Sequence, residues 1–175
     1  TGEGFAPATG TAAGSTGFIG GGIYKSTDTT GTSFSVLPAT VPSALTSNWI
    51  FIYEMAASPI TARVYAATNG GLFMTDDGGA TWTNPVIYPN TLPYNLPAHD
   101  VEVGPDGCVY AVVGDKIFYS PNGDVGTFVD RSVTGVSATA IGRLEIAVAP
   151  SNTNYIYASI AKATGALHGI YRSTD

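Results

Sequence analysis

The sequence has 175 residues and a net charge of −6. Only 11% of its residues are charged, whereas 44% are hydrophobic, so it is long and apolar enough for a folded domain and is not of the disordered class. The acidic balance argues against nucleic acid as a partner, because phosphate binding needs a basic face. No apolar run reaches the roughly 18 residues of a membrane-spanning helix, and a lone cysteine, Cys108, cannot form a disulfide framework.

Four segments in chain order share an apolar strand followed by a polar loop. Their hydroxyl residues, at positions 26, 75, 120 and 173, are 49, 45 and 53 positions apart. The 22 glycines and 11 prolines favour short strands joined by turns, and no helical period competes. The segments are 22–28, 71–77, 116–122 and 169–175.

Two further strands precede each of the last three segments. A proline closes the first strand each time, at Pro59, Pro105 and Pro150, which are 46 and 45 positions apart. A fourth strand is expected to begin at the aromatic residue after each loop. Four strands in about 45–50 residues are typical of a β-propeller blade, so the fold class is predicted to be all-β. The predicted first strands are 49–53, 101–103 and 144–148, and the second strands are 63–67, 108–112 and 155–159.

This spacing divides the chain into a partial blade at 1–45, blades at 46–96 and 97–139, and a partial blade at 140–175. Propellers close with typically four to eight blades. The chain is therefore expected to be a partial propeller. Its partners would then be the remaining blades, either from a longer polypeptide or from other chains.

The loop after the second segment has a structural interpretation of its own. Gly78 and Gly79 can supply the positive φ of a tight turn, and Asp77 can accept hydrogen bonds from turn amides. Trp82 begins the next strand and can pack between blades. Two neighbouring carboxylates, Asp76 and Asp77, fall short of the roughly 6–8 oxygens that Ca²⁺ requires. No cofactor is therefore predicted, with Ca²⁺ at this pair of carboxylates as the alternative.

The stretch Thr75 to Trp82, Thr-Asp-Asp-Gly-Gly-Ala-Thr-Trp, resembles the Asp-box, Ser/Thr-x-Asp-x-Gly-x-Thr-Trp. This motif marks the bacterial neuraminidase repeats of sialidases, xyloglucanase-type glycoside hydrolases, sortilin-like receptors and photosystem assembly factors. The resemblance covers essentially the whole chain and implies a β-propeller of four-stranded antiparallel blades with Asp-box hairpins. The residues that match the motif or stand at its positions, all expected to be structural, are Ser26, Asp28, Thr75, Asp77, Gly79, Thr81, Trp82, Ser120, Asn122, Phe128, Ser173 and Asp175.

An acidic residue stands five positions before each strand-closing proline: Glu54, Asp100 and Glu145. First strands line the channel of a propeller, so these carboxylates could form a ring that binds a cation or a sugar or supplies an acid–base pair. Alternatively, each pairs with backbone or with arginine, as Arg143 could for Glu145, and this structural interpretation is favoured. Tyr88 and Tyr94, on a proline-rich loop, could stack on sugar rings or simply pack.

Together these features predict a non-catalytic binding or scaffold module that recognises glycan or protein. Its uncharged, Thr/Ser-rich composition and its resemblance to repeats of large bacterial surface proteins imply a secreted or cell-surface location. One alternative is a xyloglucanase-like glycoside hydrolase with paired carboxylates. Another is a sortilin-like or assembly-factor peptide receptor. Sialidase is disfavoured, because no arginine is followed by the Ile-Pro of the sialidase motif.

Overall fold

The computed structural model describes residues 19–86, 96–137 and 141–173, and these ranges form an all-β structure with one 3₁₀ turn, η1 (Pro38–Thr40). Tyr88, Tyr94 and Asp175 lie outside the described residues. The strands are β1 (Tyr24–Ser26), β2 (Phe34–Val36), β3 (Ile52–Ala57), β4 (Val64–Thr68), β5 (Gly71–Thr75), β6 (Ala98–Val103), β7 (Val109–Val113), β8 (Lys116–Ser120), β9 (Val129–Asp130), β10 (Ile141–Val148), β11 (Ile156–Lys162) and β12 (Leu167–Arg172).

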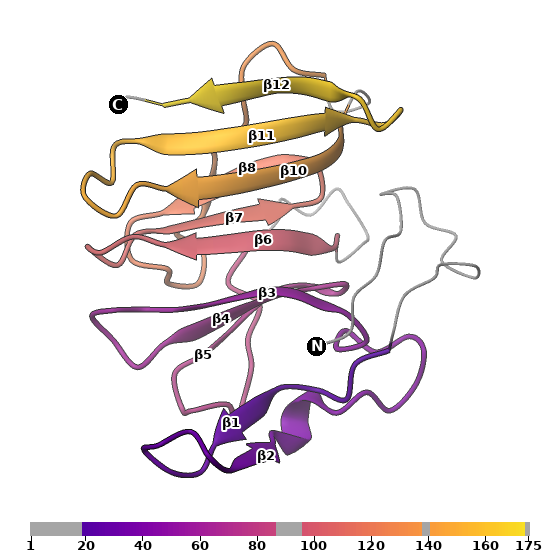
Figure 1. Ribbon diagram of the computed structural model, residues 1–175, viewed down its shortest axis with the longest axis vertical. Coiled ribbons are helices and arrows are strands. Elements are labelled where there is room, and N and C mark those ends of the chain that lie inside the picture. The colour runs from indigo at the N-terminus through magenta and orange to yellow at the C-terminus, as the bar shows by residue number, and fades with distance from the viewer. Residues whose placement is uncertain (1–18, 87–95, 138–140, 174–175) are drawn as a thin grey trace.

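The strands form four sheets, and within each sheet consecutive strands pair antiparallel. Sheet A contains β1–β2, sheet B contains β3–β4–β5, sheet C contains β6–β7–β8–β9, and sheet D contains β10–β11–β12. The sheets follow one another along the long axis of the molecule in chain order (Figure 1). No described helix is long and apolar enough to cross a membrane.

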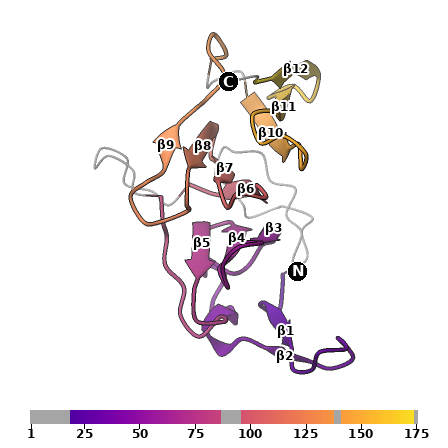
Figure 2. The ribbon, with the colours of Figure 1, turned by 90° about the vertical axis from the view of Figure 1, so that its left-hand side faces the viewer.

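Sheets B, C and D spread like a fan. Of their first strands, β3 contacts β6 and β6 contacts β10, while the later strands of each sheet extend away in different directions (Figure 2). Radiating antiparallel sheets with their first strands at the centre are the arrangement of a β-propeller. The described residues therefore form part of a propeller, as the repeats predict.

The observed strand ranges differ from the predicted ones in several places, and two of these differences concern sheet B. The first strand of sheet B begins at Ile52 instead of Trp49, because Trp49 and Ile50 turn inward and are buried before the ladder starts. The fourth strand of sheet B is reduced to a single bridge between Met74 and Thr83. The blade boundaries near 96 and 139 stay predictions, since residues 87–95 and 138–140 are outside the described ranges.

The core consists of separate layers between neighbouring sheets. Tyr65 and Leu72 of sheet B pack with Val101 and Val109 of sheet C, and all four side chains are almost fully buried. A second layer joins sheets C and D, and a third joins sheets A and B around Trp49. Burying a large apolar side chain stabilises a fold by roughly 1.5–3 kcal/mol, so each sheet depends on its neighbours.

Loops also tie the sheets together. The loop after β8 approaches sheet B so closely that a methyl group on Gly123 would lie 1.7 Å from the Tyr65 hydroxyl. The loop after β5 approaches sheet A in the same way, where a methyl group on Gly79 would lie 2.3 Å from Leu37. In both cases glycine is needed for its positive φ and also for the absence of a side chain.

Replacing Gly123 by alanine tests this contact, and Gly31 provides a matched control. Both glycines have a similar positive φ, 72° and 68°, but nothing lies within 4 Å of the position that a Cβ of residue 31 would take. We expect Gly31→Ala to cost about 1 kcal/mol of strain, and Gly123→Ala to cost at least about 2 kcal/mol more. Equal losses in urea unfolding would contradict the close packing of this loop on Tyr65.

Candidate functional site

The loop that joins β5 to the bridge at Thr83 is organised by the carboxylate of Asp77. Thr75 Oγ1 donates to Asp77 at 2.8 Å, Thr81 Oγ1 donates at 2.6 Å, and the Thr81 amide donates at 3.0 Å. Thr75 Oγ1 in turn accepts a hydrogen bond from the Gly79 amide at 2.9 Å. The hydrogen bonds from Thr81 and Thr75 lower the pKa of Asp77 below its ordinary value.

The loop after β1 repeats this arrangement with one extra residue. Asp28 accepts hydrogen bonds from Thr30, Thr32 and the Ser33 amide, all between 2.8 and 3.1 Å. Ser26 Oγ donates to the Asp28 carbonyl at 2.6 Å. The bonds from Thr30 and Thr32 lower the pKa of Asp28 as well. Both loop aspartates use their carboxylate oxygens to accept hydrogen bonds from their own turn.

The loop after β8 keeps this geometry with an amide in place of the carboxylate. Asn122 Oδ1 accepts from Thr127 Oγ1 at 3.2 Å, and Ser120 Oγ accepts from the Gly123 amide at 2.7 Å. Phe128 packs into the layer between sheets B and C. At the corresponding place after β5, Trp82 meets Trp49 edge-on with ring centroids 5.2 Å apart. In the last repeat the structure describes Ser173, whose amide donates to the Ile156 carbonyl.

The loops after β5 and β8 each bind a basic side chain from the sheet before them. Arg63 donates to both oxygens of Asp76 in its own sheet, at 2.7 and 3.1 Å. It also donates to Asp124 at 2.9 Å and to the Asn122 carbonyl at 3.1 Å, both in the loop of sheet C. Lys25 of sheet A donates to the Gly78 carbonyl of sheet B at 3.2 Å. The loops after β5 and β8 are therefore each held by polar contacts to the sheet before them.

Because the planar guanidinium of Arg63 serves two loops at once, lysine cannot replace it fully. The Arg63 side chain is 15% exposed, but its partners Asp76 and Asp124 are more than half exposed, which limits the energy of the pairs. We expect Arg63→Lys to lower the free energy of unfolding by about 1–2 kcal/mol. The exposed Arg131→Lys should change it by less than about 0.5 kcal/mol. Equal effects in urea unfolding would contradict a bridging role for Arg63.

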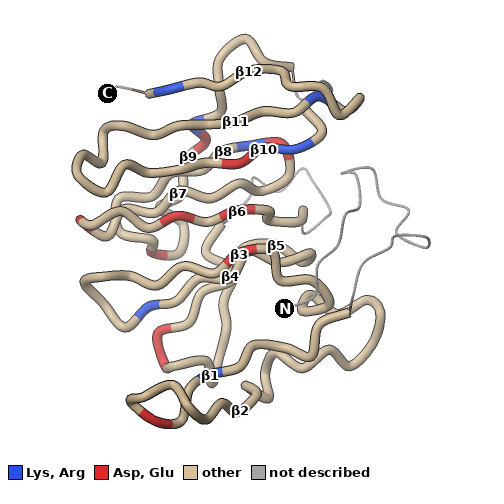
Figure 3. Tube along the Cα trace, in the orientation of Figure 1, with Lys and Arg blue, Asp and Glu red and all other residues tan. Residues whose placement is uncertain are grey.

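The structure brings the recurring acids of the first strands near one another. Glu54 lies on β3, Asp100 on β6 and Glu145 on β10, and these three strands are adjacent (Figure 3). Burial raises the pKa of Asp100, and charge repulsion from Glu145 and Glu54 adds to this effect. A fourth acid, Glu102 on β6, was not singled out by the repeat; it lies two residues after Asp100, on the same face of the strand. Partial burial raises the pKa of Glu102, and charge repulsion from Glu54 adds to this effect.

These acids are not equivalent. Asp100 is 2% exposed, and its Oδ2 accepts a hydrogen bond from the Ile146 amide of β10 at 2.6 Å. Glu145 forms an ion pair with Arg143 at 2.5 Å. Glu54 is exposed, and it follows a register shift in β3 that matches the one before Asp100 in β6. Two of the three recurring acids therefore have structural partners of the kind expected for a non-catalytic role.

Burial raises the pKa of Asp100 from 3.8 to about 7, and the neighbouring acids add to this effect, while the hydrogen bond from Ile146 opposes it. The folded protein then binds more protons than the unfolded chain between these values. The free energy of unfolding should accordingly fall as the pH rises from about 4 to 7. Glu54 and Glu102, whose pKa values are also raised, contribute with the same sign.

We expect Asp100→Asn to flatten most of this slope, because the amide oxygen can still accept from Ile146 but does not titrate. The measurement is urea unfolding at a series of pH values. Asp28→Asn is the control. Since the pKa of Asp28 is lowered, this change should shift the whole curve between pH 4 and 7 while keeping its slope. An unchanged slope in Asp100→Asn would contradict the assignment.

Within the described ranges no group of three or more His, Cys, Asp or Glu residues is arranged to hold a metal ion. His99 contacts the Tyr53 ring at a tilt, with ring centroids 5.0 Å apart, and burial lowers the pKa of His99. The tyrosine pair proposed for sugar stacking, Tyr88 and Tyr94, stays a prediction, since both lie outside the described residues.

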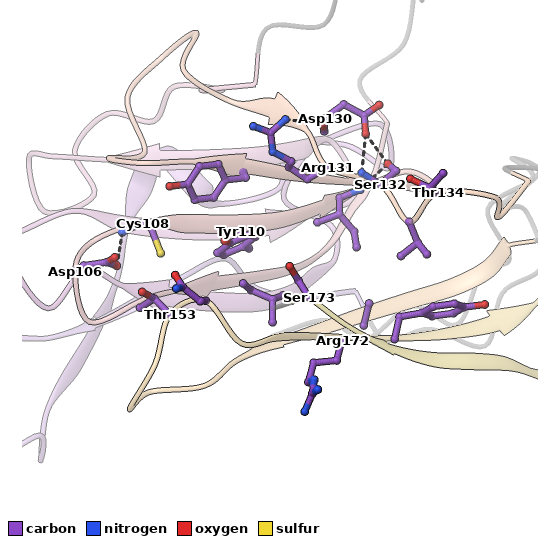
Figure 4. A pocket seen from close by; sticks show the side chains of 17 residues that line it. Asp106, Cys108, Tyr110, Asp130, Arg131, Ser132, Thr134, Thr153, Arg172 and Ser173 are labelled. Atoms are coloured by element: carbon purple, nitrogen blue, oxygen red, sulfur yellow. Dashed lines mark hydrogen bonds between the residues drawn. The ribbon is translucent and has the colours of Figure 1, made fainter. Parts of the chain in front are cut away.

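A cavity of about 830 Å³ opens between sheets C and D. Figure 4 shows Cys108, Tyr110 and Arg131 on one side of it and Thr153 and Ser173 on the other. None of its lining residues belongs to β3, β6 or β10, so it is separate from the inner acids. Cys108 is a free thiol, and burial raises its pKa to about 12, which makes it unreactive at neutral pH.

Comparison with solved structures supports the fold. The chain is similar to a GH74 xyloglucanase from Xanthomonas campestris, with a TM-score of 0.64 and 18% identity over 89% of this chain and 26% of that one. It is also similar to an ancestral GH74 enzyme, with a TM-score of 0.55 and 18% identity over 71% of this chain and 17% of that one. The chain thus spans about a quarter or less of these enzymes. No family model and no curated protein matches the sequence.

Proposed function

We propose that the chain is a non-catalytic binding or scaffold module of a secreted or cell-surface protein, with a glycan or a protein as its ligand. One observation carries this proposal: two of the three acids that recur on the inner strands are already engaged by groups of the protein itself. Asp100 is buried against the Ile146 amide, and Glu145 is paired with Arg143. A glycosidase needs two carboxyl groups that flank the scissile bond and reach it from solvent.

Further blades are part of the proposal. Tyr65, Tyr110 and Tyr157 occupy equivalent positions on the middle strands β4, β7 and β11. Tyr65 is 1% exposed beneath sheet C and Tyr110 is half-buried beneath sheet D, whereas Tyr157 is 40% exposed. Ile170, on the same face of sheet D as Tyr157, is 70% exposed. This face exposes large apolar side chains like those that sheets B and C bury against the next sheet. It therefore fits another blade, from the same polypeptide or from a partner.

A glycoside hydrolase is the second candidate, favoured by the fold of the GH74 structures and by Glu54. This residue is largely exposed and lies near Glu102. Partial loss of solvent around each carboxyl, together with neighbouring negative charge, raises the pKa of both. A carboxyl with a raised pKa can serve as a general acid. The pair would have to work without Asp100, which substrate cannot reach.

The two candidates separate in one experiment on a panel of polysaccharides that includes xyloglucan. We expect the protein to release no reducing sugar, and we expect Glu54→Gln to leave any retention on a glycan array within about twofold of wild type, since both side chains can accept hydrogen bonds. The proposal would be overturned in favour of the hydrolase if the wild-type protein released reducing sugar, if Glu54→Gln abolished this activity, and if Glu145→Gln left it intact.

A further inference from the structure

The loop after β8 contains an asparagine where the loops after β1 and β5 carry an aspartate. Asn122 stands at the place of Asp28 and Asp77, and it is followed directly by Gly123. An Asn-Gly pair can react within the chain, because glycine has no side chain that hinders attack of its backbone nitrogen on the asparagine amide. The end product of that reaction is an aspartate. Whether the amide of this loop survives therefore depends on the groups around it.

The side-chain carbonyl of Asn122 is surrounded by hydrogen-bond donors. Its Oδ1 lies 3.1 Å from the Asp124 amide, 3.2 Å from Thr127 Oγ1 and 3.3 Å from Ser120 Oγ. Donors at this oxygen stabilise the negative charge that it gains when a nucleophile adds to Cγ. Asn122 is also exposed, so water can reach it. The loop therefore favours addition at this carbonyl group.

The backbone nitrogen of Gly123 is the neighbouring nucleophile. Its amide donates to Ser120 Oγ at 2.7 Å, and the same Oγ is a donor to Asn122 Oδ1. The Ser120 hydroxyl can therefore take the proton of the Gly123 amide while it gives its own proton to Oδ1. The Arg63 guanidinium lies 3.1 Å from the main-chain carbonyl oxygen of Asn122 and makes the N–H of that peptide group more acidic.

A second Asn-Gly pair, Asn69 and Gly70, has different surroundings. The Gly70 amide also donates to a hydroxyl, Thr68 Oγ1, at 3.1 Å, but this hydroxyl donates to the Gly71 carbonyl and not to the asparagine. Asn69 Oδ1 accepts from a backbone amide at 3.0 Å, and its Nδ2 donates to a backbone carbonyl at 2.9 Å. Asn69 is half-buried as well. The chain thus contains its own control for the chemistry of this dipeptide.

We propose that Asn122 is a site of self-modification, at which the loop after β8 converts its amide into the aspartate of the other loops. In the first step the Gly123 nitrogen bonds to Cγ of Asn122, the Cγ–Nδ2 bond breaks, and ammonia leaves with the proton that the Gly123 amide gave up. In the second step water opens the resulting succinimide ring at the N–Cγ bond, which restores the backbone and leaves a carboxylate. The inference is independent of the ligand considered above.

The packing of Gly123 determines which product forms. Water can also open the ring at the bond to the main-chain carbonyl, which gives isoaspartate and lengthens the backbone by one carbon atom. Gly123 has no room for this insertion, because a Cβ there would already lie 1.7 Å from the Tyr65 hydroxyl. The carboxylate of an aspartate would instead accept from the hydroxyls of Ser120 and Thr127, as Asp77 accepts from hydroxyls in its own loop. Aspartate is therefore the expected product.

One hydrogen bond is lost in this product. Asn122 Nδ2 donates to Asp124 Oδ2 at 2.7 Å, and a carboxylate at the same place would repel Asp124. The cation of Arg63 lies 2.9 Å from Asp124 Oδ1 and offsets this repulsion. The converted loop therefore keeps its contact with sheet B.

The test incubates the folded chain at mildly alkaline pH and follows both Asn-Gly pairs by peptide mass mapping, in which conversion adds about 1 Da. We expect conversion at Asn122 to be about tenfold or more faster than at Asn69, with aspartate as the main product. In urea, which removes the tertiary contacts, the two rates should agree within about twofold. No conversion at Asn122, equal rates in the folded protein, a difference that persists in urea, or mainly isoaspartate would overturn the proposal.

Two serine variants separate proton transfer by the hydroxyl from general loosening of the loop. Ser120→Ala removes the hydroxyl that joins the Gly123 amide to Asn122 Oδ1, and it should slow conversion about tenfold or more. Ser26→Ala removes the equivalent hydroxyl in the loop after β1 and should leave the rate at Asn122 within about twofold of wild type. Both variants are first compared with wild type by thermal unfolding. Conversion that is unchanged or faster in Ser120→Ala would refute the proposed chemistry.

Discussion

The packing of each loop on the sheet before it is the contact on which the rest of the structure depends. A single antiparallel sheet of three or four short strands has two faces and cannot bury both by itself. In this protein the loop after β8 lies against Tyr65 and Arg63, and the loop after β5 lies against Leu37 and Lys25. The same loops supply Phe128 and Trp82 to the layers between sheets. One short motif therefore provides a turn, hydrogen bonds to the preceding sheet, and an aromatic side chain that packs between the two sheets.

This design has consequences for the charged groups. Only 11% of the residues are charged, and several of those in the described ranges make hydrogen bonds or ion pairs that hold strands and loops in place. Asp77 and Asp28 hold turns, Arg63 bridges two loops, and Asp100 joins the first strands of two sheets. An acid buried between inner strands is poorly suited to catalysis, because substrate cannot reach it. The similarity to GH74 structures therefore concerns the fold of this chain and does not assign it the reaction of those enzymes.

The repeat made the architecture predictable from sequence, because a four-stranded unit that recurs every four dozen residues has few alternatives. The recurring acids could be placed on neighbouring strands for the same reason. Their differences could not be foreseen: the sequence does not show that Asp100 is buried, that a register shift precedes Glu54, or that Glu102 joins the group. The role of Arg63 was equally hidden, since its partners Asp76 and Asp124 are 13 and 61 positions away and belong to different sheets. Such properties arise from tertiary contacts that no local pattern encodes.

The most direct test of this account is a nuclear Overhauser measurement between the Tyr65 ring and the Gly123 α-protons. These groups are 58 positions apart (123 − 65) and lie on successive sheets, where a methyl group on Gly123 would meet the Tyr65 hydroxyl at 1.7 Å. The account predicts strong cross-peaks in the folded protein. A well-dispersed spectrum in which Tyr65 shows contacts only within β4 and β5, and none to Gly123, would contradict the stacking of loops on preceding sheets.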